Sequence, residues 1–179
     1  KNLNPIKEKD FVDPQNYYGF TKREGEKYIE NSKSESIVIR TSWLYSKFGN
    51  NFVNTIIKNC HDKEKIEVVN DQYGCPTYAK DLAEAVMKIL ESNKRIDEDG
   101  KIFNYSNEGS TSWFNFARKI VELYKSKLEV VPVNSDYLRD KVKRPKFTIT
   151  CKNKITKSFE LKINNWDKSL NYYIINDLV

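Results

Sequence analysis

Residues 36–42 read Ser-Ile-Val-Ile-Arg-Thr-Ser, and this short run indicates the class of the fold. Consecutive β-branched apolar residues bounded by serines predict a buried strand that leads into a loop. Residues 51–60 space their apolar side chains three to four apart, as a helix does, and residues 65–69 return to the pattern of a short strand. A strand, a helix and a strand in succession predict an α/β architecture.

The same alternation continues on both sides of this run. The residue patterns predict further helices at 17–31, 79–90, 113–124 and from Asn165 onward, and further strands at 102–105 and 129–133. Ser110 and Thr111 offer an N-cap for the helix over 113–124. Residues 1–16 and 134–146 are predicted to be loops. No internal repeat or low-complexity linker divides the chain, so a single α/β unit is expected over 1–179.

Composition argues against several classes of function. The chain has 31 basic and 25 acidic residues among 179, a net charge of +6, but the two signs alternate along it, so nucleic-acid binding is not expected. No apolar run approaches the ~18 residues that a membrane span needs. One histidine and three cysteines without a CxxC pair make a metal site unexpected. We expect a cytoplasmic protein with reduced cysteines.

The first candidate for chemistry is the pair Tyr18 and Lys22 in the segment Tyr-Tyr-Gly-Phe-Thr-Lys at 17–22. Residues four apart lie on the same face of a helix. An ammonium held beside a phenol favours the phenolate form, so such a tyrosine can donate its proton to a carbonyl oxygen near neutral pH. The lysine can also bind a ribose hydroxyl. Because the chain has eleven tyrosines, a chance pairing on an ordinary amphipathic helix remains the alternative.

Several other motifs accompany this pair in a defined order. They are Asp13-Pro14-Gln15-Asn16, RTSWLY at 40–45, GNNF at 49–52, DQYGCPT at 71–77, Asp81-Leu82-Ala83 and Lys143-Arg144-Pro145. In this order and spacing they resemble the dTDP-4-dehydrorhamnose reductases, a family of extended short-chain dehydrogenase/reductases. The resemblance runs from about Pro5 onward. It implies a Rossmann-like α/β fold, of which this chain is the C-terminal part with its substrate-binding region.

The resemblance also implies what the chain does not contain. In the family, a GxxGxxG turn and a catalytic serine or threonine precede the YxxxK helix. None of the six glycines here is spaced in that way; they are Gly19, Gly25, Gly49, Gly74, Gly100 and Gly109. The phosphates of a dinucleotide need such a turn. The N-terminal cofactor-binding portion is therefore expected to be absent, and the fragment alone is expected to be inactive.

Site roles follow from the resemblance position by position. Tyr18 would be the general acid, and Lys22 its partner and a ligand of the nicotinamide ribose. The cofactor, NADPH or NADH, would be bordered by Arg40, Thr41 and Ser42. The sugar nucleotide would contact Trp43, Asn50, Asn51, Gln72, Gly74, Thr77 and Arg144.

Each of these substrate positions has a structural alternative. Trp43 could be a core aromatic residue, Asn50 and Asn51 could cap a helix, and 72–77 could be a plain turn. Arg144 could be a surface arginine. After Arg-Pro the family tends toward Asn-Ser, whereas this chain has Phe147 and Thr148, which weakens a diphosphate assignment there.

The implied reaction is reduction of the 4-keto group of dTDP-4-dehydro-β-L-rhamnose to dTDP-L-rhamnose, a step of rhamnose and polysaccharide biosynthesis. A homodimer is one possible assembly. Two alternatives stay open: a non-catalytic sugar-nucleotide-binding or regulatory subunit of the same superfamily, and a nucleotide-sugar epimerase. An epimerase would also keep YxxxK, so that motif alone does not discriminate between the two enzymes.

Overall fold

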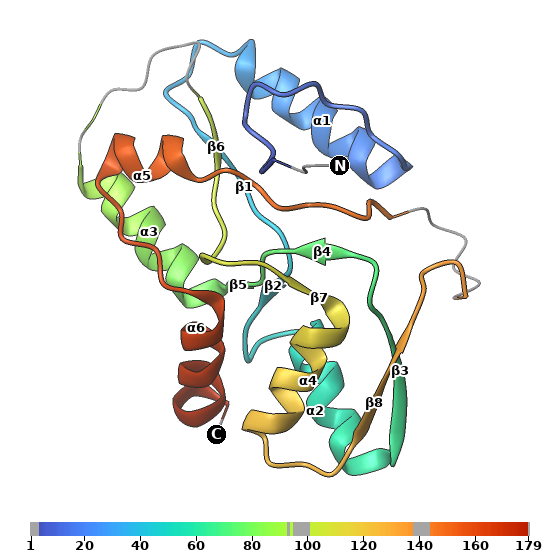
Figure 1. Ribbon diagram of the computed structural model, residues 1–179. Helices are drawn as coiled ribbons and strands as arrows, with labels where there is room; N and C mark the ends of the chain where they lie inside the picture. The colour runs from blue at the N-terminus through green and yellow to red at the C-terminus, as the bar shows by residue number, and fades with distance from the viewer. Residues whose placement is uncertain (1–3, 93, 95–100, 138–143, 179) are drawn as a thin grey trace.

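Helices and short strands alternate along the chain, as Figure 1 shows for a computed structural model that describes residues 4–92, 94, 101–137 and 144–178. The helices are α1 (Tyr17–Glu30), α2 (Phe52–Asp62), α3 (Ala79–Glu91), α4 (Trp113–Leu123), α5 (Asn153–Phe159) and α6 (Trp166–Tyr172), which continues as the π-helical turn η2 (Tyr173–Asp177). The strands are β1 (Val38–Arg40), β2 (Leu44–Tyr45), β3 (Lys65–Val69), β4 (Tyr73–Gly74), β5 (Thr77–Tyr78), β6 (Ile102–Asn104), β7 (Thr111–Ser112) and β8 (Glu129–Val133).

The strands associate in pairs, most of them parallel. The pairs β1–β6, β2–β5 and β3–β8 are parallel, and β4–β7 is antiparallel. The longest pair, β3–β8, runs in register from Lys65 opposite Glu129 to Val69 opposite Val133. Parallel neighbours need long connections between them, and here those connections carry helices. The predicted α/β class is confirmed.

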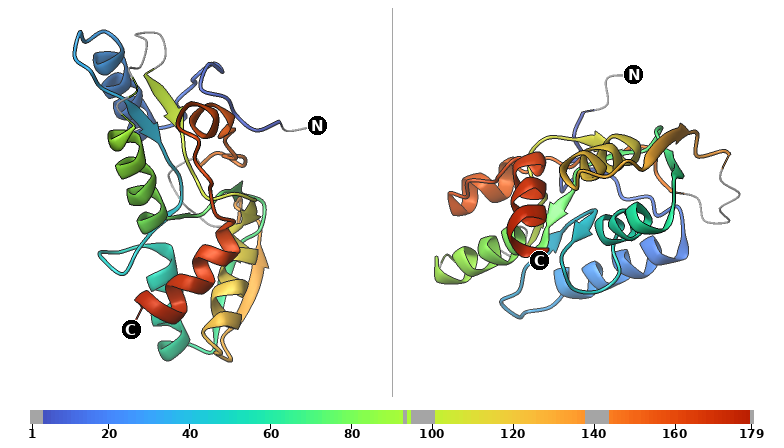
Figure 2. Two further views of the ribbon diagram at one scale, coloured as in Figure 1. Left: turned by 90° about the vertical axis from the view of Figure 1, so that its left-hand side faces the viewer. Right: turned by 90° about the horizontal axis from the view of Figure 1, so that it is seen from below.

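Two apolar clusters hold these elements together. In Figures 1 and 2, α2, α4 and α6 gather at one end of the molecule and α1 stands at the other. The larger cluster joins α2, β3, α4 and α6 through residues such as Val53, Ile66, Phe116, Ile120 and Leu170. The smaller cluster joins α3, β6 and α5 through Ala85, Ile89, Phe103, Ile155 and Phe159. Within the described ranges, no helix is long and apolar enough to cross a bilayer.

Most of the predicted elements agree with the structure. The strand predicted to be buried over 36–42 is shorter, as β1 spans Val38–Arg40, and it is half-buried rather than buried. Strands 65–69 and 129–133 are found as predicted, and the predicted helices are present with ends shifted by a few residues. The predicted N-cap of α4 is wrong, because Thr111 belongs to β7 and the Oγ of Ser112 accepts the bond from Asn115 N. The two-residue strands and α5 were not predicted. Part of the predicted loop 134–146 lies outside the described residues.

Helix α1 is held by an ion pair rather than by burial, since none of its residues is buried. Glu26 Oε1 accepts a hydrogen bond from Arg40 Nε at 2.6 Å, and Glu26 Oε2 accepts one from Arg40 Nη2 at 2.8 Å, which joins α1 to β1. Partial burial raises the pKa of Glu26, but the hydrogen bonds and charges of Arg40 and Arg23 outweigh it. The pKa of Glu26 therefore lies below its ordinary value of 4.5.

A second constraint is the close approach of Trp43 to the backbone of Gly74. A Cβ at position 74 would lie 2.5 Å from Cε2 of Trp43 and 2.8 Å from Oγ1 of Thr148. Trp43 also adopts a φ of +50°, in the left-handed region that bulky residues avoid. Such a conformation costs on the order of 1–3 kcal/mol and persists only where surrounding contacts enforce it. The indole of Trp43 is therefore tightly held against β4.

We expect the Glu26→Gln substitution to lower the free energy of unfolding by about 1–2 kcal/mol at pH 7, because hydrogen bonds to a charged acceptor are lost. The folded-state pKa of Glu26 is depressed, so its stabilisation is complete above about pH 4.5 and is lost as the pH falls below that value. The difference between wild type and variant should therefore shrink toward pH 3 in urea denaturation. Glu24→Gln, on an exposed pair with Lys27, should change stability by less than ~0.5 kcal/mol. A Glu26→Gln difference that stayed constant down to pH 3 would contradict this account.

The Gly74→Ala substitution should destabilise the fold by about 1–3 kcal/mol, because the new methyl group overlaps the indole of Trp43. Gly25→Ala is the matched control, since nothing lies within 4 Å of its added Cβ in the interior of α1. That control should gain roughly 0.5–1 kcal/mol from helix propensity. Urea denaturation followed by tryptophan emission measures both. Similar stabilities for the two variants would show that position 74 has room for a side chain.

Candidate functional site

An open groove of about 1210 Å³ runs between α2, β3 and the residues that follow β8. Helix α2 contributes Phe52, Thr55, Ile56 and Asn59, which recur every three to four residues and so share one face. Strand β3 contributes residues 66–69. The remaining wall is polar and charged and comes from Gln15, Gln72, Ser135, Asp136, Arg144 and Lys146, together with Trp113 and Pro145.

Part of the groove wall is aromatic. The rings of Phe52 and Trp113 lie 4.4 Å apart between centroids, and Trp113 stacks on Trp43 at 3.5 Å with an interplanar angle of 9°. Trp43 is itself pressed against Gly74, so the stack rests on the backbone of β4. Flat aromatic faces held in this way can stack on a base or cover a sugar ring. The groove lining also includes the cationic side chains of Arg144 and Lys146, which are suited to phosphate oxygens.

Two predicted site segments lie side by side across the β2–β5 pair. The Oγ of Ser42 donates to the carbonyl of Cys75 at 3.0 Å, and the N–H of Thr77 donates to the carbonyl of Trp43 at 3.1 Å. Thr41 Oγ1 lies 3.3 Å from Thr77 Oγ1. The motifs RTSWLY and DQYGCPT, separated by 25 residues in the sequence between 45 and 71, are thus one structural unit.

The predicted substrate residues divide into those that line the groove and those that support it. Gln72, which is 9% exposed, and Arg144 line the groove. Trp43, Gly74 and Thr77 support its aromatic wall through the contacts above. The roles of these residues in ligand binding stay predictions.

Asn50 and Asn51 behave differently from each other. Asn50 is exposed. Asn51 is the N-cap of α2, because its Oδ1 accepts from Asn54 N at 3.0 Å and its Nδ2 donates to Ser46 O at 2.7 Å. The capping alternative is confirmed for Asn51. Among the predicted cofactor residues, Arg40 turns its guanidinium to Glu26, which is a structural contact.

Tyr18 and Lys22 share one face of α1, as predicted. Lys22 Nζ lies 5.3 Å from the centroid of the Tyr18 ring, and the tyrosine is 70% exposed. Gln15, which lines the groove, precedes Tyr18 by three residues. Tyr18 and Lys22 themselves are not among the residues that line the groove.

Sequence reasoning missed the groove wall on α2 and did not assign Trp113 to the site. Trp113 does pack in the core cluster, but it also lines the groove. The signal that could have revealed the wall is the polar pair Thr55 and Asn59 on the same face as Phe52, since a helix stripe that only packs would be apolar. Within the described ranges, no group of three or more His, Cys, Asp or Glu side chains is placed to hold a metal ion.

The sequence of the chain is similar to a family model and to several known proteins. Residues 1–178 match the model described as the RmlD substrate binding domain. A spore coat polysaccharide biosynthesis protein, SpsK, of Bacillus subtilis is 35% identical over 97% of this chain and 59% of its own length. A dTDP-4-dehydrorhamnose reductase of Aggregatibacter actinomycetemcomitans is 34% identical over 92% of this chain and 58% of its own length.

A solved structure agrees with these relatives. The dTDP-4-dehydrorhamnose reductase of Bacillus anthracis, a complex with NADP, superposes with a TM-score of 0.85 at 34% identity, over 96% of this chain and 59% of that one. The chain thus spans less than two thirds of the length of the proteins it resembles. The match over residues 1–178 shows that the chain belongs to the RmlD substrate-binding domain family.

Proposed function

We propose that this chain is the substrate-binding and proton-donating part of an NAD(P)H-dependent reductase that converts dTDP-4-dehydro-β-L-rhamnose to dTDP-L-rhamnose. The observation that carries the proposal is the groove, which is lined by aromatic and by cationic side chains. The Tyr18–Lys22 pair lies on α1, the helix that begins two residues after the groove residue Gln15. A nucleotide sugar has the complementary order of parts: a flat base, a diphosphate and a sugar. Relatives that are named as dTDP-4-dehydrorhamnose reductases support the same assignment.

The binding mode follows from the groove lining. The base stacks against Trp113 and Phe52, where flat apolar faces are available. The diphosphate lies toward Arg144 and Lys146, whose charges complement it. The 4-keto sugar then extends toward Tyr18 at the start of α1.

In the proposed reaction, this chain supplies the proton that the 4-keto oxygen accepts. The hydroxyl of Tyr18 donates to the 4-keto oxygen, and the ammonium of Lys22 stabilises the phenolate that remains. As a donor set, the exposed phenol and ammonium fit the carbonyl of the sugar and the ribose hydroxyls of a dinucleotide. NADPH or NADH, when bound, supplies the hydride. No glycine-rich turn for its phosphates occurs in these 179 residues, so residues 1–179 alone are expected to bind the sugar nucleotide without turnover.

We expect Arg144→Ala to weaken the binding of dTDP to this chain by about tenfold, or ~1.4 kcal/mol, because a charged contact to the diphosphate is lost. Isothermal titration calorimetry at low salt measures the change. Arg118→Ala is the control: this exposed arginine of α4 contacts Phe114 and is not among the residues that line the groove. Equal affinities of the wild type and both variants for dTDP would show that Arg144 does not contribute to diphosphate binding.

Tyr18→Phe should lower kcat by roughly 10²-fold or more in the complete reductase proposed to contain this chain, because a general acid is removed. NADPH oxidation with dTDP-4-dehydrorhamnose measures kcat, and the dissociation constant of dTDP should stay unchanged. Tyr28→Phe, on the same helix and 79% exposed, is the matched control. A wild-type protein that binds both ligands tightly without turnover would be a non-catalytic binding subunit, which is the alternative function.

A further inference from the structure

Asp71 lies outside the groove lining, yet its carboxylate contacts two residues that form the groove wall. Its Oδ1 accepts a hydrogen bond from Ser135 N at 2.9 Å, and its Oδ2 accepts one from Ser135 Oγ at 2.7 Å. Lys146 Nζ lies 2.9 Å from the same Oδ2. One carboxylate therefore joins the turn after β3 to two separate positions on the polar rim.

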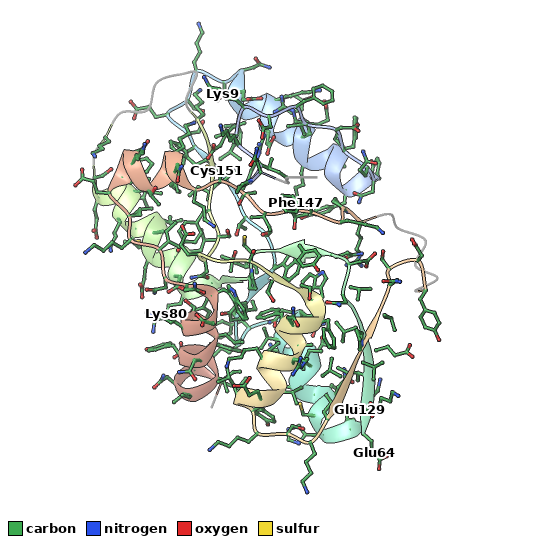
Figure 3. All side chains as sticks on the ribbon, in the orientation of Figure 1. Lys9, Glu64, Lys80, Glu129, Phe147 and Cys151 are labelled. Carbon is green, nitrogen blue, oxygen red and sulfur yellow. The ribbon has the colours of Figure 1, made fainter. Side chains whose placement is uncertain are left out.

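The strand pairing explains why Ser135 meets Asp71. Strands β3 and β8 stay in register up to Val69 opposite Val133, and the N–H of Asn70 donates to the carbonyl of Val133 at 2.9 Å. Asp71 and Ser135 come next on either side of the pair. In Figure 3, Glu64 and Glu129 mark the opposite end of this pair, far from Phe147. The contact thus closes the end of the β3–β8 pair that adjoins the groove.

The position of Lys146 is also set by backbone pairing. The carbonyl of Lys146 accepts from Tyr73 N, and the carbonyl of Tyr73 accepts from Thr148 N, both at 2.9 Å. These bonds form a parallel bridge between Tyr73 and Phe147 beside β4. The main chain of Lys146 is therefore fixed, whereas its side chain is 63% exposed and is held by Asp71.

We propose that Asp71 is a positioning residue for the diphosphate of the ligand, because it holds Lys146 and Ser135 in the arrangement that the polar rim needs before the ligand arrives. The inference rests on the proposed function of the groove. A free lysine side chain loses rotamer entropy when it is fixed. A carboxylate that orders the side chain in advance lowers that cost at the moment of binding.

The charge state of Asp71 suits this role. Partial burial raises the pKa of the carboxyl group, but the hydrogen bonds from Lys146 and Ser135 outweigh it and bring the pKa to about 2. The group is therefore ionised throughout the neutral range. Exposed ion pairs of this kind add little to global stability, so the consequence of losing the carboxylate should appear in ligand binding.

The test compares two probes on the wild-type chain and on Asp71→Asn: dTDP, which carries the diphosphate, and thymidine, which does not. We expect the dissociation constant of dTDP to rise about tenfold in the variant, while that of thymidine and the melting temperature change little. Asp62→Asn removes the same charge from an exposed residue at the end of α2 that is not among the groove-lining residues, and so controls for net charge. It should bind dTDP as tightly as the wild type.

A double variant, Asp71→Asn with Lys146→Met, distinguishes an effect that passes through Lys146 from a folding defect. In the Lys146→Met background, Asp71→Asn should weaken dTDP binding by clearly less than in the wild type, because part of its effect passes through Lys146. An equal loss for thymidine and dTDP, or unchanged or tighter dTDP binding in Asp71→Asn, would overturn the inference and leave the groove assignment standing. A wild-type chain that binds neither probe would overturn the proposed function and the inference with it.

Discussion

The contact on which the groove depends is the indole of Trp43 lying against the bare backbone of Gly74. A side chain at position 74 would overlap the indole, and Trp43 accepts a left-handed backbone conformation to reach it. From there the indole stacks on Trp113, which carries the contact to α4, while the carbonyl of Trp43 binds Thr77 and starts the β2–β5 pair. Because contacts from several sides hold Trp43 in this strained conformation, the aromatic wall is rigid, as a stacking surface requires.

Two parts of the groove wall are held by different interactions. The aromatic side chains of Trp43, Phe52 and Trp113 pack against the larger apolar cluster. The polar rim is held by one carboxylate and a few backbone bonds, and α1 is held by the Glu26–Arg40 pair without any buried residue. Electrostatic attachments of this kind adjust more easily than packed cores. The catalytic pair proposed on α1 and the diphosphate rim therefore share a looser attachment than the aromatic side chains.

Local sequence patterns were enough to predict the long helices and the five-residue strands. Strands 65–69 and 129–133 and the long helices carry their periodicity within their own residues, so the sequence alone indicates them. The two-residue strands β2, β4, β5 and β7 have no period, and their hydrogen-bond partners lie tens of residues away. Thr111 was expected to cap α4, but it pairs with Gly74 in β4. Gly74 is distant in the sequence, so the residue pattern around Thr111 does not reveal this contact.

The sequence by itself determined the α/β class, the family resemblance and the shared face of Tyr18 and Lys22, because residue order and helical spacing are properties of the chain alone. Only the tertiary structure decided which polar side chains meet. It turned Arg40 to Glu26, made Asn51 a cap, added Phe52, Asn59 and Trp113 to the groove, and joined Asp71 to Ser135 and Lys146. Such contacts depend on strand register and helix packing over long sequence separations, which no local pattern encodes.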